Sequence, residues 1–372
     1  MSKSDSDEDD FEELTELGEQ LIYCILAEEP LENIKALVAD APLWYQNDAE
    51  GISCLHAAAY TRNRELVKLL IDEGAIWNSV DYLHNTAADI ALSFNDTEIY
   101  TLIRDAGLRA ELLLAVLSSR GAPADTSAMI LQANDTTALA STDAFLSSKL
   151  RFTVDQNGQE ICMLDANGEE VGVMMGWEDG IMQETARTLS SELERPKVIN
   201  VGFGLGIIDT LFQSLSPSLH VIVEAHPDVL SHMRQQGWYE KPGVKILEGK
   251  WQDFINSEKL DGLVPEGGFD IVYTDPFSED YGELRRFFGH VPALLGPRGR
   301  FSFFHGLGAT NPTIYDVYSR VAEVHLSDLG IDVKWSEVNV SQQRHKWGNS
   351  RPYFTVPTYR LPLCIRRGNS SG

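Results

Sequence analysis

A glycine-rich loop in the second half of the chain is the first feature whose spacing suits ligand chemistry. It consists of Val201, Gly202, Phe203, Gly204, Leu205 and Gly206. Glycines permit a tight turn there and let a ligand approach the backbone closely. The dinucleotide fingerprint is Gly-x-Gly-x-x-Gly, and in this chain the third glycine comes one position early. A strand–turn–helix corner without a ligand is the structural alternative.

Acidic and aromatic residues follow the next two apolar segments. Glu224 ends the first of them, eighteen residues after Gly206, where a carboxylate can accept hydrogen bonds from both ribose hydroxyls of an adenosine. Nicotinamide cofactors are held in the same way, so this acid alone does not identify the ligand. His226, Trp251 and Gln252 lie where an adenine would dock. Core packing is the alternative for Trp251.

Asp275 follows a further apolar run, in the sequence Tyr-Thr-Asp-Pro-Phe. Open α/β sheets bind ligands outside the carboxyl ends of their strands. We therefore expect Asp275 to meet the glycine-rich loop and Glu224 at one edge of a sheet. A structural turn residue is the alternative for Asp275.

The elements that must bring these residues together are the strands of a parallel sheet. Five short apolar segments alternate with helical patterns, which predicts parallel strands covered on both faces. They span 197–203, 219–226, 244–249, 269–275 and 299–305. The segments 331–340 and 353–363 are close together and should add an antiparallel edge pair. The result is a seven-stranded, mainly parallel sheet of the Rossmann-like group.

Two Asn-Gly pairs, at 157–158 and 167–168, precede this sheet and separate alternating segments. Asn-Gly favours the type I′ turn of a tight hairpin. The pattern predicts a three-stranded meander that leads into a helix near 177–193.

The N-terminal third is a succession of helical patterns with internal repetition. The segment 51–58, GISCLHAA, approximates the ankyrin signature Thr-Pro-Leu-His-x-Ala, and Thr86 repeats Ser53 at a spacing of 33 residues. Such stacked units usually bind proteins, with a purely structural cap as the alternative. The predicted domains are an acidic disordered tail (1–15), ankyrin-like helical repeats (16–119), a linker (120–145) and the sheet domain (146–372).

Composition narrows the possible partners and locations. The formal net charge of −26 disfavours direct binding to nucleic acid and favours basic protein partners. No apolar run is long enough to span a membrane. The four cysteines are scattered, so we expect neither disulfides nor a metal site, and a cytoplasmic and nuclear location. We also expect a monomer.

The motifs together resemble a known family. VMMGWEDGIM (173–182), VGFGLG, IVEAH, GKWQD, YTDPFSE and YFTVPTYRLPL are similar to guanidinoacetate N-methyltransferase over about 146–372. The form Gly-x-Gly-x-Gly is typical of class I S-adenosylmethionine (SAM) methyltransferases. With the ankyrin-like region in front, the whole chain resembles the fungal protein arginine methyltransferases that modify the internal (δ) nitrogen of arginine.

This resemblance implies SAM as the methyl donor, an arginine in a protein as the acceptor, and no metal. Glu178 and Asp275 would be catalytic and hold the guanidinium, and Trp177 would help Glu178 to bind the substrate. The family often has an acid at the position of Asn200, so this chain departs from the family's pattern at a position that contacts the methionine end of the cofactor. The implied cofactor-binding residues are Phe152, Met174, Met182, Val201, Gly202, Phe203, Gly204, Leu205, Gly206, Glu224, Ala225, His226, Trp251, Gln252 and Asp275.

The residue types suit this acceptor without the resemblance. A guanidinium is planar and cationic, and its five N–H donors match carboxylates bidentately. Glu178 and Asp275 would fix its position and rotation, while Trp177 would stack on its face. The enzyme's main tasks would be alignment and removal of a proton by one of the two carboxylates. A solvated helix acid is the alternative for Glu178.

Four other functions compete with this interpretation. A nucleobase aminomethyltransferase would use Asp/Asn-Pro-Pro-Tyr/Phe, and this chain lacks the second proline. A nicotinamide oxidoreductase would need the complete dinucleotide fingerprint. A methyltransferase for small guanidino compounds would not need the ankyrin-like region, and a non-enzymatic scaffold would not need both acids and the glycine-rich loop.

Overall fold

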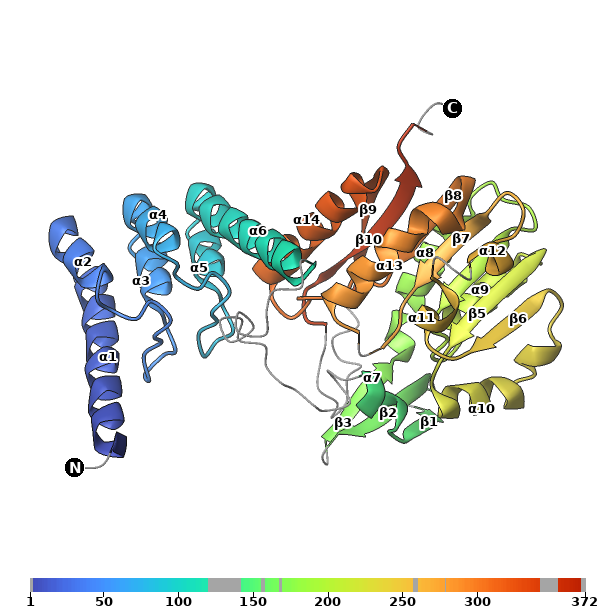
Figure 1. Cartoon of the computed structure of the whole chain (residues 1–372), viewed down its shortest axis with the longest axis horizontal. Helices are drawn as coiled ribbons and strands as arrows, with labels where there is room; N and C mark the ends of the chain where they lie inside the picture. The colour runs from blue at the N-terminus through green and yellow to red at the C-terminus, as the bar shows by residue number, and fades with distance from the viewer. Residues whose placement is uncertain are drawn as a thin grey trace. The chain divides into compact units, whose positions relative to one another are not determined.

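The computed structural model describes residues 3–119, 142–154, 158–166, 169–256, 260–277, 279–341 and 354–368 (Figure 1). The chain divides into two compact units. One comprises Met1–Pro123 and Gly308–Val321, and the other comprises Ala124–Leu307 and Ala322–Gly372. Within the described ranges, no helix has the length and apolar character that crossing a membrane would require.

The first unit is a stack of helices. They are α1 (Lys3–Leu26), α2 (Leu31–Val38), α3 (Cys54–Tyr60), α4 (Arg64–Asp72), α5 (Ala87–Ser93), α6 (Thr97–Ser119) and the first part of α14 (Pro312–Asp328). The pairs α3–α4 and α5–α6 are the two units that the 33-residue period predicts. Single β-bridges, Gln46 with Ser53 and Val80 with Thr86, precede α3 and α5.

Reciprocal capping boxes fix the start of each repeat. In α3, Ser53 Oγ accepts from the His56 amide, and the Ser53 amide donates to His56 Nδ1 at 3.1 Å. In α5, the Thr86 amide donates to Asp89 Oδ2 at 2.8 Å. His56 Nε2 also lies 3.0 Å from the backbone oxygen of Asn85, which ties one repeat to the next. These contacts satisfy amides that a helix start leaves unpaired.

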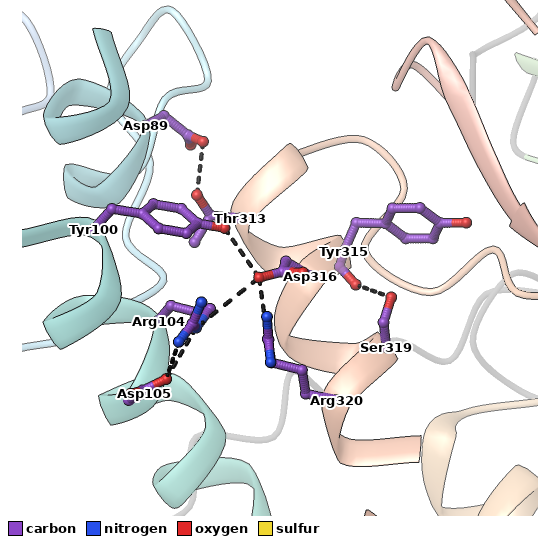
Figure 2. Close-up of polar contacts among 9 residues, drawn as sticks. All are labelled: Asp89, Tyr100, Arg104, Asp105, Thr313, Tyr315, Asp316, Ser319 and Arg320. Carbon is purple, nitrogen blue, oxygen red and sulfur yellow. Dashed lines mark hydrogen bonds and ion pairs between the residues drawn. The ribbon is translucent and has the colours of Figure 1, made fainter. Parts of the chain in front are cut away.

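The first part of α14 completes this stack (Figure 2). Asp89 accepts hydrogen bonds from Thr313 Oγ1 at 2.7 Å and from Asn311 Nδ2 at 2.6 Å. Asp316 accepts from the hydroxyl of Tyr100 at 3.1 Å. The predicted boundary is therefore wrong for 308–321, which belong with the ankyrin-like unit. Sequence distance hid this, because the contacts join residues more than two hundred positions apart.

The acidic N-terminus also differs from its prediction. Residues 3–15 are the start of α1, where the sequence predicts a disordered tail. The ring of Phe11 stacks on that of Trp44, with centroids 6.2 Å apart.

The second unit begins with a small antiparallel sheet of order β1–β2–β3, which confirms the predicted meander. Most of the predicted linker lies outside the described residues, but 142–145 form α7, and Phe145 is buried in the core of this unit. The elements are α7 (Thr142–Leu146), β1 (Leu150–Val154), β2 (Glu160–Ala166), β3 (Glu169–Met174), η2 (Gly176–Glu178) and α8 (Asp179–Ser190).

A seven-stranded sheet of order β6-β5-β4-β7-β8-β10-β9 forms the centre of this unit. The first five strands are parallel, and β10 runs antiparallel between β8 and β9. This confirms the predicted Rossmann-like, mainly parallel fold. The strands are β4 (Lys197–Val201), β5 (Leu219–Glu224), β6 (Val244–Glu248), β7 (Phe269–Thr274), β8 (Leu295–Phe303), β9 (Ile331–Asn339) and β10 (Thr358–Arg366).

Helices cover both faces of the sheet (Figure 1). Successive side chains of β4 point to opposite faces of the sheet. Val198 packs on one face with α8, with α9 (Ile207–Ser214) and with α10 (Pro227–Gln235). Ile199 and Val201 pack on the other face with α13 (Tyr281–Leu294) and the second part of α14. The connecting helices are α9 (Ile207–Ser214), α10 (Pro227–Gln235), η3 (Trp238–Glu240), α11 (Trp251–Phe254), α12 (Leu260–Leu263) and α13 (Tyr281–Leu294). The double cover leaves the carboxyl ends of the strands as the place for a site.

Candidate active site

A cavity of about 380 Å³ lies where the parallel strands end. Gly202 follows β4, Glu224 ends β5 and Asp275 follows β7, and all three line the cavity. Met174 and Glu178 add a wall from the segment between the meander and α8. The volume is within the usual range for small-molecule sites. The fold thus brings together the groups that the sequence predicts at this edge.

The glycine-rich loop requires its glycines. Gly202, Gly204 and Gly206 have φ values of 90°, 56° and 72°, a region that other residues rarely adopt. A Cβ on Gly202 would lie 2.4 Å from the backbone oxygen of Asp275, and one on Gly204 would lie 2.6 Å from Met174 Sδ. The glycine-rich loop therefore packs closely against the ends of β7 and β3. The cavity occupies the space outside this loop.

Glu224 holds the glycine-rich loop in place. Its carboxylate accepts backbone hydrogen bonds from Phe203 (2.9 Å), Ala225 (2.8 Å) and His226 (2.7 Å). Burial raises the pKa of Glu224, and these hydrogen bonds oppose the rise. The Gly204 amide is a fourth backbone donor to this carboxylate, which has about four acceptor positions, so a ligand hydroxyl would have to share or displace one of these bonds.

Asp275 and Glu178 differ in how their carboxylates are used. Glu178 is buried and accepts a hydrogen bond from the Met175 amide at 3.1 Å, so it is not the solvated helix acid of the alternative. For Asp275, no residue that the structure describes supplies a hydrogen bond or ion pair to the carboxylate. Burial alone raises the pKa of Asp275 to about 7. A carboxylate in this state gains stability when a cation binds beside it.

The cavity as a whole is acidic. Lys250 is the only basic residue among its described lining residues, and its Nζ pairs with Asp143 Oδ1 at 2.5 Å. A wall with this excess of acidic residues attracts positively charged ligands. The acidic lining residues are Glu178, Glu224, Asp275, Glu279 and Asp280.

The cavity wall contains only part of the predicted cofactor set. The predicted residues that line it are Met174, Glu178, Val201, Gly202, Gly204, Glu224, Ala225, Trp251 and Asp275. Those that lie outside the lining are Phe152, Met182, Phe203, Leu205, Gly206, His226 and Gln252. Several of these support the wall from behind. The side chain of Trp177 lies outside the described part of the chain, so its predicted stacking stays a prediction.

The supporting residues have clear structural roles. Phe152 stacks on His232, with ring centroids 4.1 Å apart. Met182 is buried and its sulfur accepts from the Tyr273 hydroxyl at 3.5 Å. His226 caps α10, because its Nδ1 accepts from the backbone amide of Asp228 at 3.1 Å.

Glu279 is a lining residue that sequence reasoning did not assign. Its carboxylate accepts from Trp251 Nε1 at 2.8 and 3.0 Å and from Gln252 Nε2 at 3.3 Å. Burial raises the pKa of Glu279 to about 7. The only signal for Glu279 in the sequence is its position at the end of the run YTDPFSE, four residues after Asp275.

Asn200 departs from the family's usual acid, and the structure shows what it does instead. Its Nδ2 donates to the backbone oxygen of Gly202 at 2.9 Å and to Asp209 Oδ2 at 2.8 Å. Asp209 is buried and also contacts His220 Nε2 at 3.0 Å. The carboxylate of this polar cluster therefore comes from α9, and Asn200 links it to the glycine-rich loop.

Comparison with known proteins agrees with this arrangement. A family model for ankyrin repeats (three copies) matches residues 21–112, and one for guanidinoacetate N-methyltransferase matches 159–308. The protein arginine N-methyltransferase 2 of Cryptococcus neoformans is 41% identical, over 88% of this chain and 89% of its own. This chain belongs to the protein arginine N-methyltransferase 2 family. The Emericella nidulans protein of that name is 40% identical, over 81% of this chain and 77% of its own.

The cavity of this protein arginine N-methyltransferase 2 family member fits SAM, which its methyltransferase fold implies. SAM carries a sulfonium, an ammonium and a carboxylate group, so it is a net cation, and the wall has five carboxylates against one paired lysine. Side chains at Gly202 or Gly204 would collide with Asp275 or Met174 and displace the loop that borders the cavity. The charge of the wall therefore suits this ligand, and the glycines keep the loop in the position that leaves room for it.

Proposed function

We propose that this chain transfers a methyl group from SAM to the internal (δ) nitrogen of an arginine in a basic protein, such as a ribosomal protein. The observation that carries the proposal is Asp275, a carboxylate without a described partner in an acidic cavity that Glu178 also lines. The choice of the δ nitrogen rests on the resemblance to the fungal arginine methyltransferases. The choice of a basic substrate rests on the net charge of −26.

Chain residues divide the cavity by task. SAM supplies an electrophilic methyl group when it is bound. The backbone from Gly202 to Gly204 would border its methionine part, and Glu224 would accept from its ribose hydroxyls. Asp275 and Glu178 remain for the guanidinium. The backbone of Asp275 touches the glycine-rich loop at Gly202, and Glu178 lines the same cavity.

The two carboxylates would act on the arginine in two ways. They bind the guanidinium through charge-assisted hydrogen bonds, which fixes its position and rotation. One of them also accepts the proton that the nitrogen loses when it is methylated, because the guanidinium, with a pKa above about 12, does not release this proton to water near neutral pH. Asp275 is the better acceptor of that proton, because burial has already raised its pKa to about 7.

Two variants test this division. Asp275→Asn should lower kcat by roughly 10²- to 10⁴-fold and leave SAM affinity nearly unchanged. Glu178→Gln keeps an oxygen for the Met175 amide but removes the charge, so it should mainly raise KM for the substrate. Calorimetric SAM binding serves as the control for both. Near-normal turnover in Asp275→Asn would refute the proposed role.

Product analysis tests the acceptor. The purified chain is incubated with methyl-labelled SAM and a cytosolic extract, and labelled protein is hydrolysed for mass spectrometry. Methylarginine with fragment ions of the δ isomer is the expected result, whereas a label on a terminal nitrogen would refute the δ assignment. Label confined to small molecules would favour the guanidinoacetate-like alternative. Absence of both label and SAM binding would favour a scaffold.

The ankyrin-like unit offers a separate surface for the protein partner. A cavity of about 570 Å³ in this unit is lined by both apolar and acidic side chains, among them Tyr60, Tyr82, Leu83 and Glu50. Residues 1–119 contain 24 acidic and 7 basic residues, a net charge of −17 out of the chain's −26. We infer that a basic segment of the substrate protein binds here, because charge complementarity favours such a partner.

Matched surface variants test this surface. Tyr82→Ala and Leu83→Ser change residues that are 64% and 81% exposed and line this cavity. They should raise KM for the intact protein substrate and leave KM for a short arginine peptide unchanged. Tyr23→Ala is the control, since Tyr23 is 68% exposed but lies outside the lining. Equal effects of all three variants would refute this docking surface.

We also propose a cytoplasmic and nuclear location. The four cysteines are all free and buried, and unpaired cysteines suit a reducing compartment. Microscopy of a tagged chain tests the location, and accumulation in a secretory compartment would refute it.

A further inference from the structure

The order of the strands determines where each part of SAM lies, if it binds in the cavity as proposed. The glycine-rich loop follows β4, and Asp275, the proposed proton acceptor, follows the neighbouring strand β7. Glu224 ends β5, on the other side of β4. A ligand whose reacting end is near β4 and β7 and whose ribose is at β5 must extend its base toward β6.

The cavity wall next to β6 contains an aromatic ring and a carboxylate. Trp251 is the first residue of α11, shortly after β6, and its indole is buried against Phe287, with ring centroids 5.3 Å apart. Glu279 reaches this ring from the segment after β7 and accepts from Trp251 Nε1 at 2.8 Å. Both residues line the cavity. The base would therefore meet an apolar wall with one acidic group at its edge.

Glu279 has acceptor capacity beyond its observed contacts. A carboxylate has about four acceptor positions, and Glu279 receives one indole N–H and one amide donor, Gln252 Nε2 at 3.3 Å. Burial outweighs these bonds and raises the pKa of Glu279 to about 7. The nearest lysine of the wall, Lys250, is paired with Asp143 instead. A neutral N–H donor on the ligand could therefore bind to a remaining acceptor position of the Glu279 carboxylate.

We propose that Glu279 accepts a hydrogen bond from the exocyclic amine of the SAM adenine, and so makes the site selective for adenine over bases that lack this amine. Trp251 would contact the base and hold the carboxylate in place through its indole N–H. Glu279 is thus a specificity residue for the cofactor, separate from the acids assigned to the guanidinium. This inference rests on the proposed binding of SAM in the cavity.

The test compares two ligands by calorimetry, without turnover. One is S-adenosylhomocysteine, and the other is the same molecule with unsubstituted purine in place of adenine. At about pH 8.5, where the Glu279 carboxyl with its pKa of about 7 is ionised, the wild-type chain should bind the purine analogue about 10- to 100-fold more weakly, the range expected for losing a hydrogen bond to a charged acceptor. Similar affinities for the two ligands would overturn the inference. Absence of binding by S-adenosylhomocysteine would instead refute the proposed function.

Variants assign the selectivity to one residue. Glu279→Met should lower the affinity for S-adenosylhomocysteine to that of the purine analogue. The affinity for the purine analogue itself should stay nearly unchanged. Glu283→Met is the matched control, because Glu283 also accepts from Gln252 Nε2 (2.8 Å) but lies outside the lining. Glu283→Met should keep the wild-type ratio of the affinities for S-adenosylhomocysteine and the purine analogue. Equal weakening of both ligands by Glu279→Met would show a merely structural role and overturn the inference.

A conservative variant guards against loss of the fold. Glu279→Gln keeps the size of the side chain and an oxygen for Trp251 Nε1. It replaces a charged acceptor with a neutral one, which makes weaker hydrogen bonds. The ratio of the two affinities should therefore fall below the wild-type value, and an unchanged ratio would count against Glu279.

Discussion

The carboxylate of Asp89 accepts a hydrogen bond of 2.7 Å from the hydroxyl of Thr313, although 224 residues separate them in the chain. Asp89 occupies the position that His56 has in the preceding repeat, 33 residues earlier. His56 contacts the loop of the next repeat, at the backbone oxygen of Asn85. Asp89 instead meets donors at the start of α14, so this helix takes the place of a further repeat. The contact explains how so few repeats form a stable stack.

Removing the Thr313 hydroxyl should therefore destabilise the ankyrin-like unit. Thr313→Val leaves the partly buried carboxylate of Asp89 with one donor fewer, at a cost of about 1–3 kcal/mol in unfolding free energy. Chemical denaturation of Thr313→Val, Asp89→Asn and the double variant measures the coupling. We expect a coupling energy of at least about 0.5 kcal/mol. Strictly additive effects would mean that this contact does not stabilise the stack.

A side chain at Gly202 should be tolerated poorly. Gly202→Ala faces both a φ of 90° and a Cβ only 2.4 Å from the backbone oxygen of Asp275. Gly330→Ala is the control, because Gly330 has a φ of 73° and no atom within 4 Å of the added Cβ. The control should lose about 1–2 kcal/mol, and Gly202→Ala more than that, together with SAM binding. Equal losses would show that the close approach to Asp275 is unimportant.

Asp275 should reduce stability at neutral and basic pH. In the unfolded chain its carboxyl loses a proton near pH 3.8, but in the folded protein only near pH 7. The folded state therefore loses stability as pH rises through this window. At pH 8, Asp275→Asn should raise the unfolding free energy by on the order of 1–4 kcal/mol, with little gain at pH 4. Thermal unfolding of Asp275→Asn between pH 4 and pH 8 tests this prediction. Asp253→Asn is the control, because Asp253 is exposed.

The buried His305 should have the opposite dependence on pH. Burial and the nearby Arg360 lower the pKa of His305 to about 3, whereas the unfolded chain binds the proton near pH 6.5. Stability is therefore lost as pH falls below about 6.5, by about 2 kcal/mol at pH 5. His305→Gln should lose less stability than the wild type between pH 7.5 and 5. Parallel curves in chemical denaturation would contradict this.

The sequence by itself determined the class of fold and the main groups of the site. The alternation of apolar segments with helical patterns specifies a parallel sheet, and strand ends in such a sheet must share one edge. Gly202, Glu224 and Asp275 could therefore be placed together before their geometry was known. The 33-residue period identified the repeats for a similar reason, because one structural unit recurs at that spacing.

Tertiary structure alone decided which of the predicted side chains face the cavity. Met182 and His226 are buried and Phe152 packs against the core, so none of the three lines the cavity, whereas Glu279 does. The start of α14 belongs to the ankyrin-like unit for a related reason. Its partners, such as Asp89 for Thr313, are distant in sequence, and local periodicity contains no information on such pairs. Side-chain direction and long-range pairing depend on the packed fold, whereas element type and strand-end position depend on local pattern.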